Sequence, residues 1–120
     1  MNPTNIRRGE RLARPLAKPG RLRRETLRAD TDDGIERIPP GTCFKRARTQ
    51  EVTYLMYLGC ANDDPECLYF LELGATHLPS IGLPERYRRS AWLTDYEAGI
   101  SLDERVSLTD AMTAVYETQQ

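Results

Sequence analysis

Two apolar segments on either side of a short polar turn constrain the fold of this chain more than any other feature. Residues 52–58 (VTYLMYL) and 67–73 (CLYFLEL) are rich in aromatic and β-branched residues and are apolar at consecutive positions. This pattern is typical of strands that are covered on both faces. We expect Gly59 to end the first strand and residues 61–66 (ANDDPE) to form a loop. Strands joined by so short a loop pair antiparallel, because parallel pairs need long crossover connections.

A third strand is expected just before this pair. Residues 38–41 (IPPG) are a turn signal, and residues 42–47 (TCFKRA) then begin with β-forming side chains. Residues 48–51 (RTQE) would close a hairpin onto the next strand. Residues 86–94 (RYRRSAWLT) alternate imperfectly between apolar and polar positions, which predicts a fourth strand, with a short helix as the alternative.

The C-terminal segment carries the pattern of an amphipathic helix. Ser107 and Asp110 resemble a capping box, and residues 101–105 are expected to add a turn before it. Five apolar residues then recur at the spacing that forms one face of a helix, namely Leu108, Ala111, Met112, Val115 and Tyr116. We expect this apolar stripe to pack on one face of the sheet.

Together these elements predict an α+β protein with a small, curved antiparallel sheet of three to five strands and a C-terminal amphipathic helix. A partly open SH3-like barrel is one arrangement that fits the pattern. The 120 residues contain no apolar run near the ~20 residues that span a bilayer, and the N-terminus does not match a secretory signal. Three cysteines are too few for a disulfide framework, so we expect a reduced, cytoplasmic protein.

The net charge of −1 hides a division between the two ends of the chain. Residues 1–29 carry nine basic and two acidic side chains, whereas residues 30–120 carry eight basic and sixteen acidic ones. All nine aromatic residues lie after position 43. A segment with so few large apolar groups cannot bury enough surface to offset the cost of ordering its backbone. We therefore expect residues 1–33 to be a basic arm that is disordered when free, and residues 34–120 to form a single domain.

The basic arm has the composition of a phosphate-binding segment. Its arginines outnumber its single lysine eight to one, and the planar guanidinium suits phosphate and carboxylate groups alike. Basic side chains bind nucleic acid by neutralising phosphates and releasing counterions. The alternatives are docking on an acidic protein, folding back on the chain's own acidic domain, and no specific role. The predicted contact residues of the arm are Arg7, Arg8, Arg11, Arg14, Lys18, Arg21, Arg23, Arg24 and Arg28.

A second candidate contact site combines Arg86, Arg88 and Arg89 with Trp92. Arginine beside an exposed aromatic residue is a combination enriched at protein interfaces and at RNA-binding surfaces. The alternative is that Tyr87 and Trp92 belong to the core and that the arginines are solvated.

The remaining candidates for chemistry are weaker. Cys60 and Cys67 are separated by six residues, and Cys43 and His77 could come near them, but the closely spaced cysteine pair of a zinc knuckle is missing. A Cys60–Cys67 disulfide and a cysteine–histidine catalytic pair are further alternatives, and we favour plain core or loop cysteines. No phosphate-loop, dinucleotide-binding or metalloprotease motif occurs in the chain. We therefore expect no metal, no cofactor and no enzymatic activity.

The sequence thus predicts a small, non-enzymatic binding or regulatory protein. In this hypothesis the basic arm attaches to nucleic acid or a nucleoprotein assembly, and the β domain docks on a specific partner, with no membrane involved. The alternative is a protein-interaction module or inhibitor, of the accessory kind found in phages and plasmids, whose acidic domain blocks a partner's functional surface. The residues of that acidic surface would be Asp63, Asp64, Glu66, Asp95 and Glu97.

Overall fold

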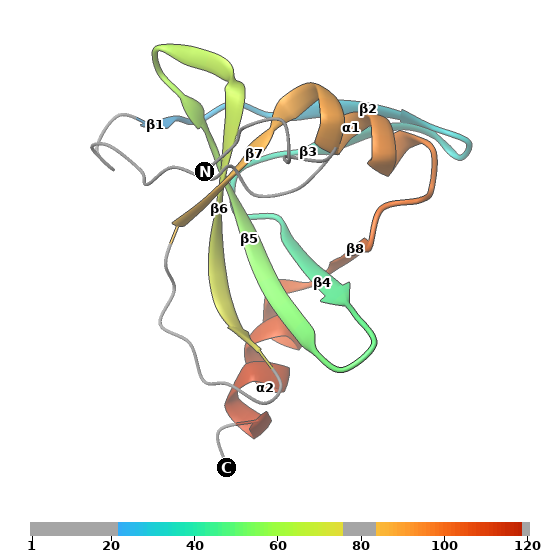
Figure 1. The fold of residues 1–120 in the computed structure, drawn as a ribbon, viewed down its shortest axis with the longest axis vertical. Helices are drawn as coiled ribbons and strands as arrows, with labels where there is room; N and C mark the ends of the chain where they lie inside the picture. The colour runs from blue at the N-terminus through green and yellow to red at the C-terminus, as the bar shows by residue number, and fades with distance from the viewer. Residues whose placement is uncertain (1–21, 76–83, 119–120) are drawn as a thin grey trace.

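The computed structural model describes residues 22–75 and 84–118, which form eight strands and two helices (Figure 1). The strands are β1 (Leu22–Arg23), β2 (Leu27–Thr31), β3 (Gly34–Ile38), β4 (Cys43–Ala47), β5 (Val52–Ala61), β6 (Asp64–Ala75), β7 (Pro84–Arg88) and β8 (Asp103–Val106). The helices are α1 (Arg89–Glu97) and α2 (Leu108–Thr118).

All strand pairs in the described part of the chain are antiparallel. The main sheet has the order β7-β6-β5-β4-β8, and the short β1 pairs with the end of β5, beyond β4. β2 and β3 form a separate two-stranded ribbon. The main sheet curves without closing; β2, β3 and α1 lie near one end of the long β5–β6 hairpin and α2 near the other (Figure 1). The predicted α+β class with a mostly antiparallel sheet is confirmed, although the main sheet has six strands rather than three to five.

The predicted meander of β4, β5 and β6 is confirmed, and its last two strands are longer than expected. The β4–β5 hairpin closes where the Arg48 N–H donates to the Glu51 carbonyl (2.8 Å). β5 does not end at Gly59 but continues for two residues beyond it. Gly59 has a φ of 135°, and a Cβ atom there would lie 2.2 Å from the carbonyl oxygen of Arg23. Glycine at this position therefore lets β1 lie against β5 instead of ending the strand.

The segment that was expected to form a strand or a short helix forms both, because β7 leads directly into α1. The Glu66 carboxylate accepts a hydrogen bond from the Ser90 N–H in the first turn of α1 (2.7 Å). An anion here satisfies a free N–H group and complements the positive end of the helix dipole. The expected turn at residues 101–105 is wrong, because Asp103–Val106 pairs with β4 as strand β8.

The larger core lies between one face of the sheet, helix α1 and the β2–β3 ribbon. The ring centre of Trp92 lies 5.4 Å from those of both Phe44 and Phe70. Cys43, Cys60 and Cys67 are all buried and free. The favoured interpretation of core cysteines is thus confirmed. The Cys60–Cys67 disulfide is not formed, and Cys60 is paired with Leu68 in the β5–β6 ladder.

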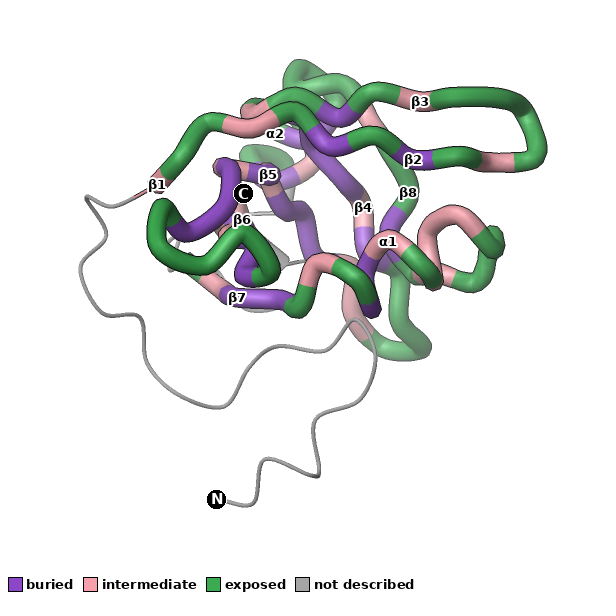
Figure 2. Tube along the Cα trace, turned by 90° about the horizontal axis from the view of Figure 1, so that it is seen from above, coloured by how far each residue is buried: buried purple, intermediate pink, exposed green. Residues whose placement is uncertain are grey.

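The predicted boundary between arm and domain, after residue 33, is wrong for residues 22–33. These residues form β1, β2 and the turn into β3, and Leu27 and Ala29 are completely buried. Buried and exposed positions alternate along β2 (Figure 2). A strand needs only every second side chain to be apolar to cover a core, so a segment with few apolar residues still folds here. The rest of the predicted arm, residues 1–21, lies outside the described residues.

Helix α2 begins where the Ser107 hydroxyl oxygen accepts a hydrogen bond from the Asp110 N–H (3.0 Å). It covers the opposite face of the sheet with Ala111 and Val115, which are buried. Only part of the predicted apolar stripe packs in this way. The other three members are 47–66% exposed, namely Leu108, Met112 and Tyr116. No helix within residues 22–75 and 84–118 is long and apolar enough to cross a membrane.

Candidate nucleic-acid interface

The β2–β3 ribbon has one face against the core and one face toward solvent. The paired residues Leu27 and Ile38 are buried on the inner face. At the next pair of the ladder, Arg28 lies directly opposite Arg37, and both are exposed. The turn is a tight one, in which the Thr31 hydroxyl donates to the Gly34 carbonyl (3.0 Å).

The inner face of the ribbon is fixed to the rest of the fold by hydrogen bonds. The Glu36 carboxylate accepts one from the Tyr96 hydroxyl (2.8 Å) and one from the Arg105 guanidinium (2.9 Å). The Arg105 guanidinium also donates to the Arg37 carbonyl (2.9 Å), and the Glu97 carboxylate accepts from the Asp30 N–H (2.7 Å). Burial and the hydrogen bond to Glu36 raise the pKa of Tyr96, so its hydroxyl remains a donor at neutral pH. These contacts hold the ribbon in one position relative to α1 and β8.

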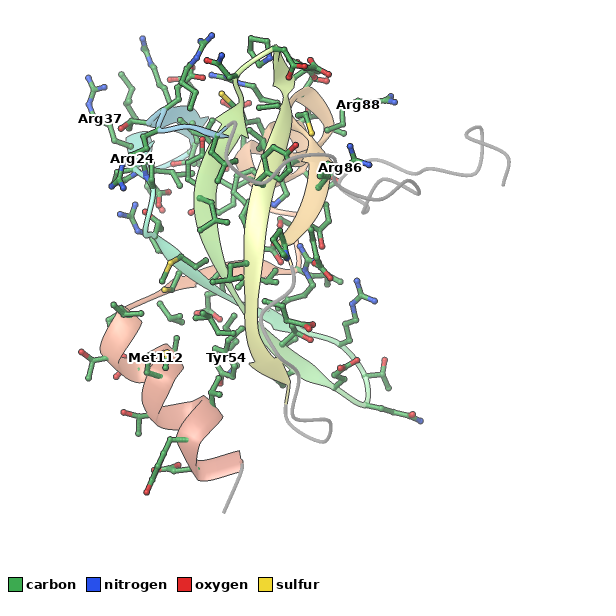
Figure 3. All side chains as sticks on the ribbon, turned by 90° about the vertical axis from the view of Figure 1, so that its left-hand side faces the viewer. Arg24, Arg37, Tyr54, Arg86, Arg88 and Met112 are labelled. Carbon is green, nitrogen blue, oxygen red and sulfur yellow. The ribbon has the colours of Figure 1, made fainter. Side chains whose placement is uncertain are left out.

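The solvent face of the ribbon carries positive charge that the described residues do not neutralise. Arg28 forms an ion pair with Asp30 (3.5 Å), but both side chains are more than 60% exposed, and such surface pairs contribute little. Within the described part of the chain, no carboxylate lies in ion-pair range of Arg24 or Arg37. Figure 3 shows these two arginines on the same side of the molecule. We call Arg24, Arg28 and Arg37 the ribbon face.

The pairing of Arg28 with Arg37 places two like charges opposite each other, and within the described residues only the exposed Asp30 carboxylate lies in ion-pair range of either. Like charges directly opposite each other in a β ladder repel, and Arg28 and Arg37 occupy such a pair. The arginine fork binds phosphate through two parallel hydrogen bonds. An anion placed between the two guanidinium groups would remove the repulsion and form charge-assisted hydrogen bonds with both.

The segment that leads into the ribbon is held by Glu25. Its carboxylate accepts hydrogen bonds from the Cys60 thiol (3.0 Å) and from the Arg89 guanidinium (3.1 Å), and its carbonyl accepts one from the Tyr57 hydroxyl (2.7 Å). The hydrogen bond from Cys60 and the one from Arg89 lower the pKa of Glu25. Burial, together with Glu25, raises the pKa of Cys60 to about 11, so the thiol remains protonated and donates. Glu25 therefore fixes the chain just before the ribbon face.

The second predicted contact site is largely wrong. Arg86 is 7% exposed and Trp92 is 2% exposed, so neither presents a binding surface. The Trp92 indole nitrogen donates to the Asp103 carboxylate (2.8 Å), and Arg89 is engaged by Glu25. Trp92 belongs to the core because α1 packs that side chain against the sheet. Of the four predicted residues only Arg88 is exposed, and Figure 3 shows it away from Arg24 and Arg37.

The predicted arm residues divide into two groups. Arg24 and Arg28 are part of the ribbon face, and Arg23 is an exposed neighbour whose guanidinium donates to the Asn62 carbonyl (3.4 Å). Arg37 was missed by sequence reasoning. The signal that could have found the hairpin is the turn sequence Asp32-Asp33-Gly34, and a turn at Asp32 and Asp33, which pairs Thr31 with Gly34, is the one that places Arg37 opposite Arg28. The other predicted residues lie outside the described part of the chain: Arg7, Arg8, Arg11, Arg14, Lys18 and Arg21.

The predicted acidic surface is not brought together as one site of free carboxylates. Asp63, Asp64 and Glu66 lie at the tip of the β5–β6 hairpin, where the Ser90 side chain and N–H lower the pKa of Glu66. Asp95 and Glu97 lie on α1. Glu66 and Glu97 are each hydrogen-bonded to a backbone N–H group of the fold. Both therefore contribute to the structure itself.

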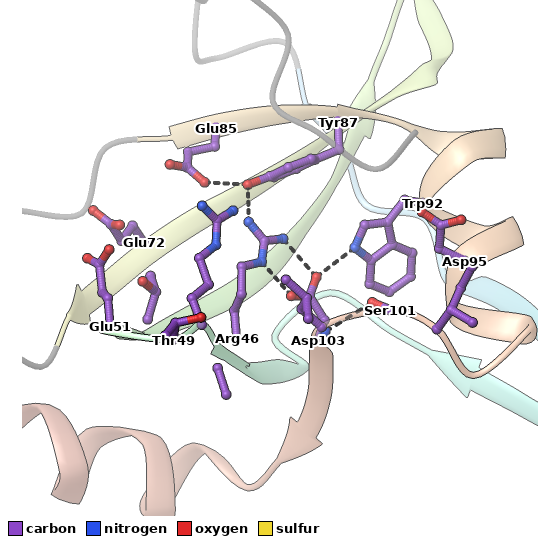
Figure 4. Close-up of a pocket in the computed structure, with 15 residues that line it drawn as sticks. Arg46, Thr49, Glu51, Glu72, Glu85, Tyr87, Trp92, Asp95, Ser101 and Asp103 are labelled. Atoms are coloured by element: carbon purple, nitrogen blue, oxygen red, sulfur yellow. Dashed lines mark hydrogen bonds and ion pairs between the residues drawn. The ribbon is translucent and has the colours of Figure 1, made fainter. Parts of the chain in front are cut away.

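A cavity of about 910 Å³ opens between β7 and the β4–β5 hairpin, and Arg46 lies on its floor (Figure 4). Two nitrogens of Arg46 donate to the two carboxylate oxygens of Asp103, and a third donates to the Tyr87 hydroxyl. The Tyr87 hydroxyl in turn donates to Glu85 (2.7 Å). Burial lowers the pKa of Arg46, but the hydrogen bonds and charge of Asp103 outweigh it and raise the pKa above its ordinary value. This network joins β4 to the two edge strands β7 and β8.

The described residues that line the cavity leave no buried polar side-chain atom without a hydrogen-bond partner. Every buried side-chain nitrogen and oxygen atom in the described part of the chain has a hydrogen-bond partner. No group of histidine, cysteine, aspartate or glutamate residues within residues 22–75 and 84–118 could hold a metal ion. His77, the one histidine, lies outside the described residues. Among the described residues, the ribbon face is therefore the strongest candidate for a ligand-binding site, because its positive charge is exposed and only partly paired.

Comparison with known proteins adds no relative from which a function could be transferred. No protein-family model, no curated protein and no solved structure matches this chain.

Proposed function

We propose that this protein is a non-enzymatic nucleic-acid-binding protein that contacts phosphate groups through the ribbon face. The single observation that supports this most strongly is the pairing of Arg28 with Arg37 on an exposed face. Two arginines at directly opposite positions of the ladder can each present a guanidinium fork that matches phosphate oxygens. The inner face of the ribbon is fixed to α1 and β8, so little backbone conformational entropy is lost when an anion binds.

The N-terminal segment extends the same chemistry in the sequence. Residues 1–21 contain six further basic residues and one acidic residue, and they directly precede β1. In the proposal these residues add phosphate contacts of low sequence preference, and the β domain docks on the remainder of a nucleoprotein assembly.

A second part of the proposal concerns the fold alone and starts from the curvature of the main sheet. We infer a partly open SH3-like barrel whose two edge strands, β7 and β8, are linked by the Arg46 network. The support is that Arg46 bonds to Tyr87 on one edge strand and to Asp103 on the other. A fold of this kind does not by itself indicate a function.

The experiment is a fluorescence anisotropy titration of the full chain on a labelled 20-base-pair duplex at low salt. The double variant Arg28→Ala/Arg37→Ala should bind about tenfold more weakly or worse, because two phosphate contacts are lost. The matched control is Arg88→Ala, which removes an exposed arginine away from the ribbon face and should change the affinity less than about twofold.

A loss of binding free energy per arginine that is as large in the control as in the double variant would contradict the proposal, since charge alone would then explain binding. Absence of binding by the unmodified chain would favour the protein-interaction alternative, in which Asp63 and Asp64 are the residues to replace.

A further inference from the structure

The aromatic residues limit which nucleic acid the ribbon face suits. Neither β2 nor β3 contains an aromatic residue. All nine aromatic residues of the chain are described, and six of them are buried. Tyr69 and Tyr96 are half-buried, and the exposed Tyr116 lies on α2, at the other end of the molecule from the ribbon (Figure 1). Proteins that bind single strands stack bases on exposed aromatic rings, and the ribbon face has no such ring.

The tip of the ribbon limits how a duplex could approach. Asp30, Asp32 and Asp33 are all exposed at or beside the turn, whereas Arg28 and Arg37 lie nearer the other end of the ribbon. A two-stranded ribbon that reads base edges enters the major groove, between two rows of phosphates. Carboxylates at the tip would then face phosphates on both sides. Insertion is therefore opposed by charge, while contact between the arginines and one phosphate row is favoured.

We infer that the ligand is a double-stranded nucleic acid, bound from outside along its phosphate backbone and without reading of the base sequence. This inference rests on the proposed function and adds the class of nucleic acid to it. A duplex carries one charge per about 1.7 Å of its axis, and each neutralised phosphate of a duplex releases more counterion than one of a single strand. The ribbon face has the arginines that use this difference and lacks the aromatic rings on which the bases of a single strand would stack.

The test measures the affinity of the full chain for four labelled 20-mers at one salt concentration. The probes are a DNA duplex, a DNA duplex of shuffled sequence, one single strand of the first duplex, and an RNA duplex. We expect the two DNA duplexes to bind within about twofold of each other and at least about tenfold more tightly than the single strand. Binding of the RNA duplex as well would identify the shared phosphate backbone as the ligand, and its failure to bind would assign the site to DNA.

The outcomes separate this inference from the proposed function. Tighter binding of the single strand, or a strong preference for one duplex sequence, would overturn the inference and leave phosphate binding intact. Lack of binding to all four probes would instead reject the proposed function.

A second variant examines the direction of approach. Asp32→Asn/Asp33→Asn removes two exposed negative charges from the turn and should tighten duplex binding severalfold without changing sequence preference. If the tip inserted into the groove and its carboxylates accepted hydrogen bonds from bases, the same variant would weaken binding, and the inference would be wrong.

Discussion

Arg46 and Arg37 occupy opposite environments within the same fold. Arg46 is 7% exposed, and all three of its guanidinium nitrogens donate hydrogen bonds, two to the Asp103 carboxylate and one to the Tyr87 hydroxyl. Arg37 is exposed, and its nearest partner across the ladder is another arginine, Arg28. In the interior, the charge of Arg46 is matched by the opposite charge of Asp103. On the ribbon face the positive charges exceed the negative ones, which leaves capacity for an external anion.

The largest expected effect on the free energy of unfolding comes from replacing the buried Arg46. Arg46→Met would leave the Asp103 carboxylate, whose side chain is 2% exposed, without its opposite charge. Removal of one partner of a buried ion pair costs about 3–5 kcal/mol, so the free energy of unfolding from urea denaturation should fall by that amount. The double variant Arg46→Met/Asp103→Leu removes both charges and should lose much less. If it lost as much as the single variant, packing rather than charge would explain the effect.

The next effect concerns the place where β1 holds the start of the ribbon segment. Gly59→Ala would place a methyl group 2.2 Å from the Arg23 carbonyl oxygen at a φ of 135°, so β1 must move. We expect a loss of at least about 2 kcal/mol in the free energy of unfolding, measured by urea denaturation.

The matched control is Gly34→Ala, which has a φ of 117° but nothing within 4 Å of the added Cβ atom. It should cost about 1 kcal/mol, from backbone strain alone. Equal costs in the two variants would mean that β1 does not lie against β5 in solution.

A smaller effect is expected from Glu25, and it depends on pH. Hydrogen bonds from Cys60 and Arg89 lower the pKa of Glu25 below its usual value of 4.5. The charged form therefore adds stability at pH values above 4.5, and this stability is lost as the pH falls below that value. Glu25→Gln should lower the free energy of unfolding by about 1 kcal/mol at pH 7, and the difference from the unmodified protein should shrink toward pH 3. A difference that stayed constant from pH 7 to pH 3 would contradict this account of Glu25.

The smallest effect on stability is expected on the ribbon face. Arg37→Ala removes one member of a like-charged pair and no described ion pair. The free energy of unfolding should stay within about 0.5 kcal/mol of the unmodified value, with a small gain at low salt where repulsion is least screened. A clear loss of stability would show that Arg37 has a structural role, and the ribbon face could not then be regarded as reserved for a ligand.

The parts of the fold that local patterns determine could be predicted from the sequence. The apolar segments of β5 and β6 and the turn between β4 and β5 are confirmed, because each depends on neighbouring residues. The role of Gly59 could not be predicted, since it depends on the approach of β1 from 36 positions earlier in the chain. The burial of Leu27 was missed for a related reason. The average composition of residues 1–33 is low in large apolar residues and does not reveal the alternation of buried and exposed positions along β2.

The candidate site was predicted in part. Arg24 and Arg28 were identified from charge alone, whereas Arg37 required knowledge of the β2–β3 register. The arginines that precede Trp92 in the sequence left a binding surface and the core both open for its side chain. Its side chain is in the core because α1 turns it toward Phe44. Charge patterns therefore suggest an anion as the proposed ligand, and strand pairing was needed to place Arg37 beside Arg28.

The salt dependence of duplex binding tests the central claim most directly. The logarithm of the dissociation constant should be measured against the logarithm of salt concentration for the unmodified chain and for Arg28→Ala/Arg37→Ala. If the ribbon face neutralises two phosphates, the slope for the double variant should be smaller by about 2, while Arg88→Ala should keep the slope of the unmodified chain. Parallel lines for all three proteins would contradict the claim that the paired arginines of the ribbon bind phosphate.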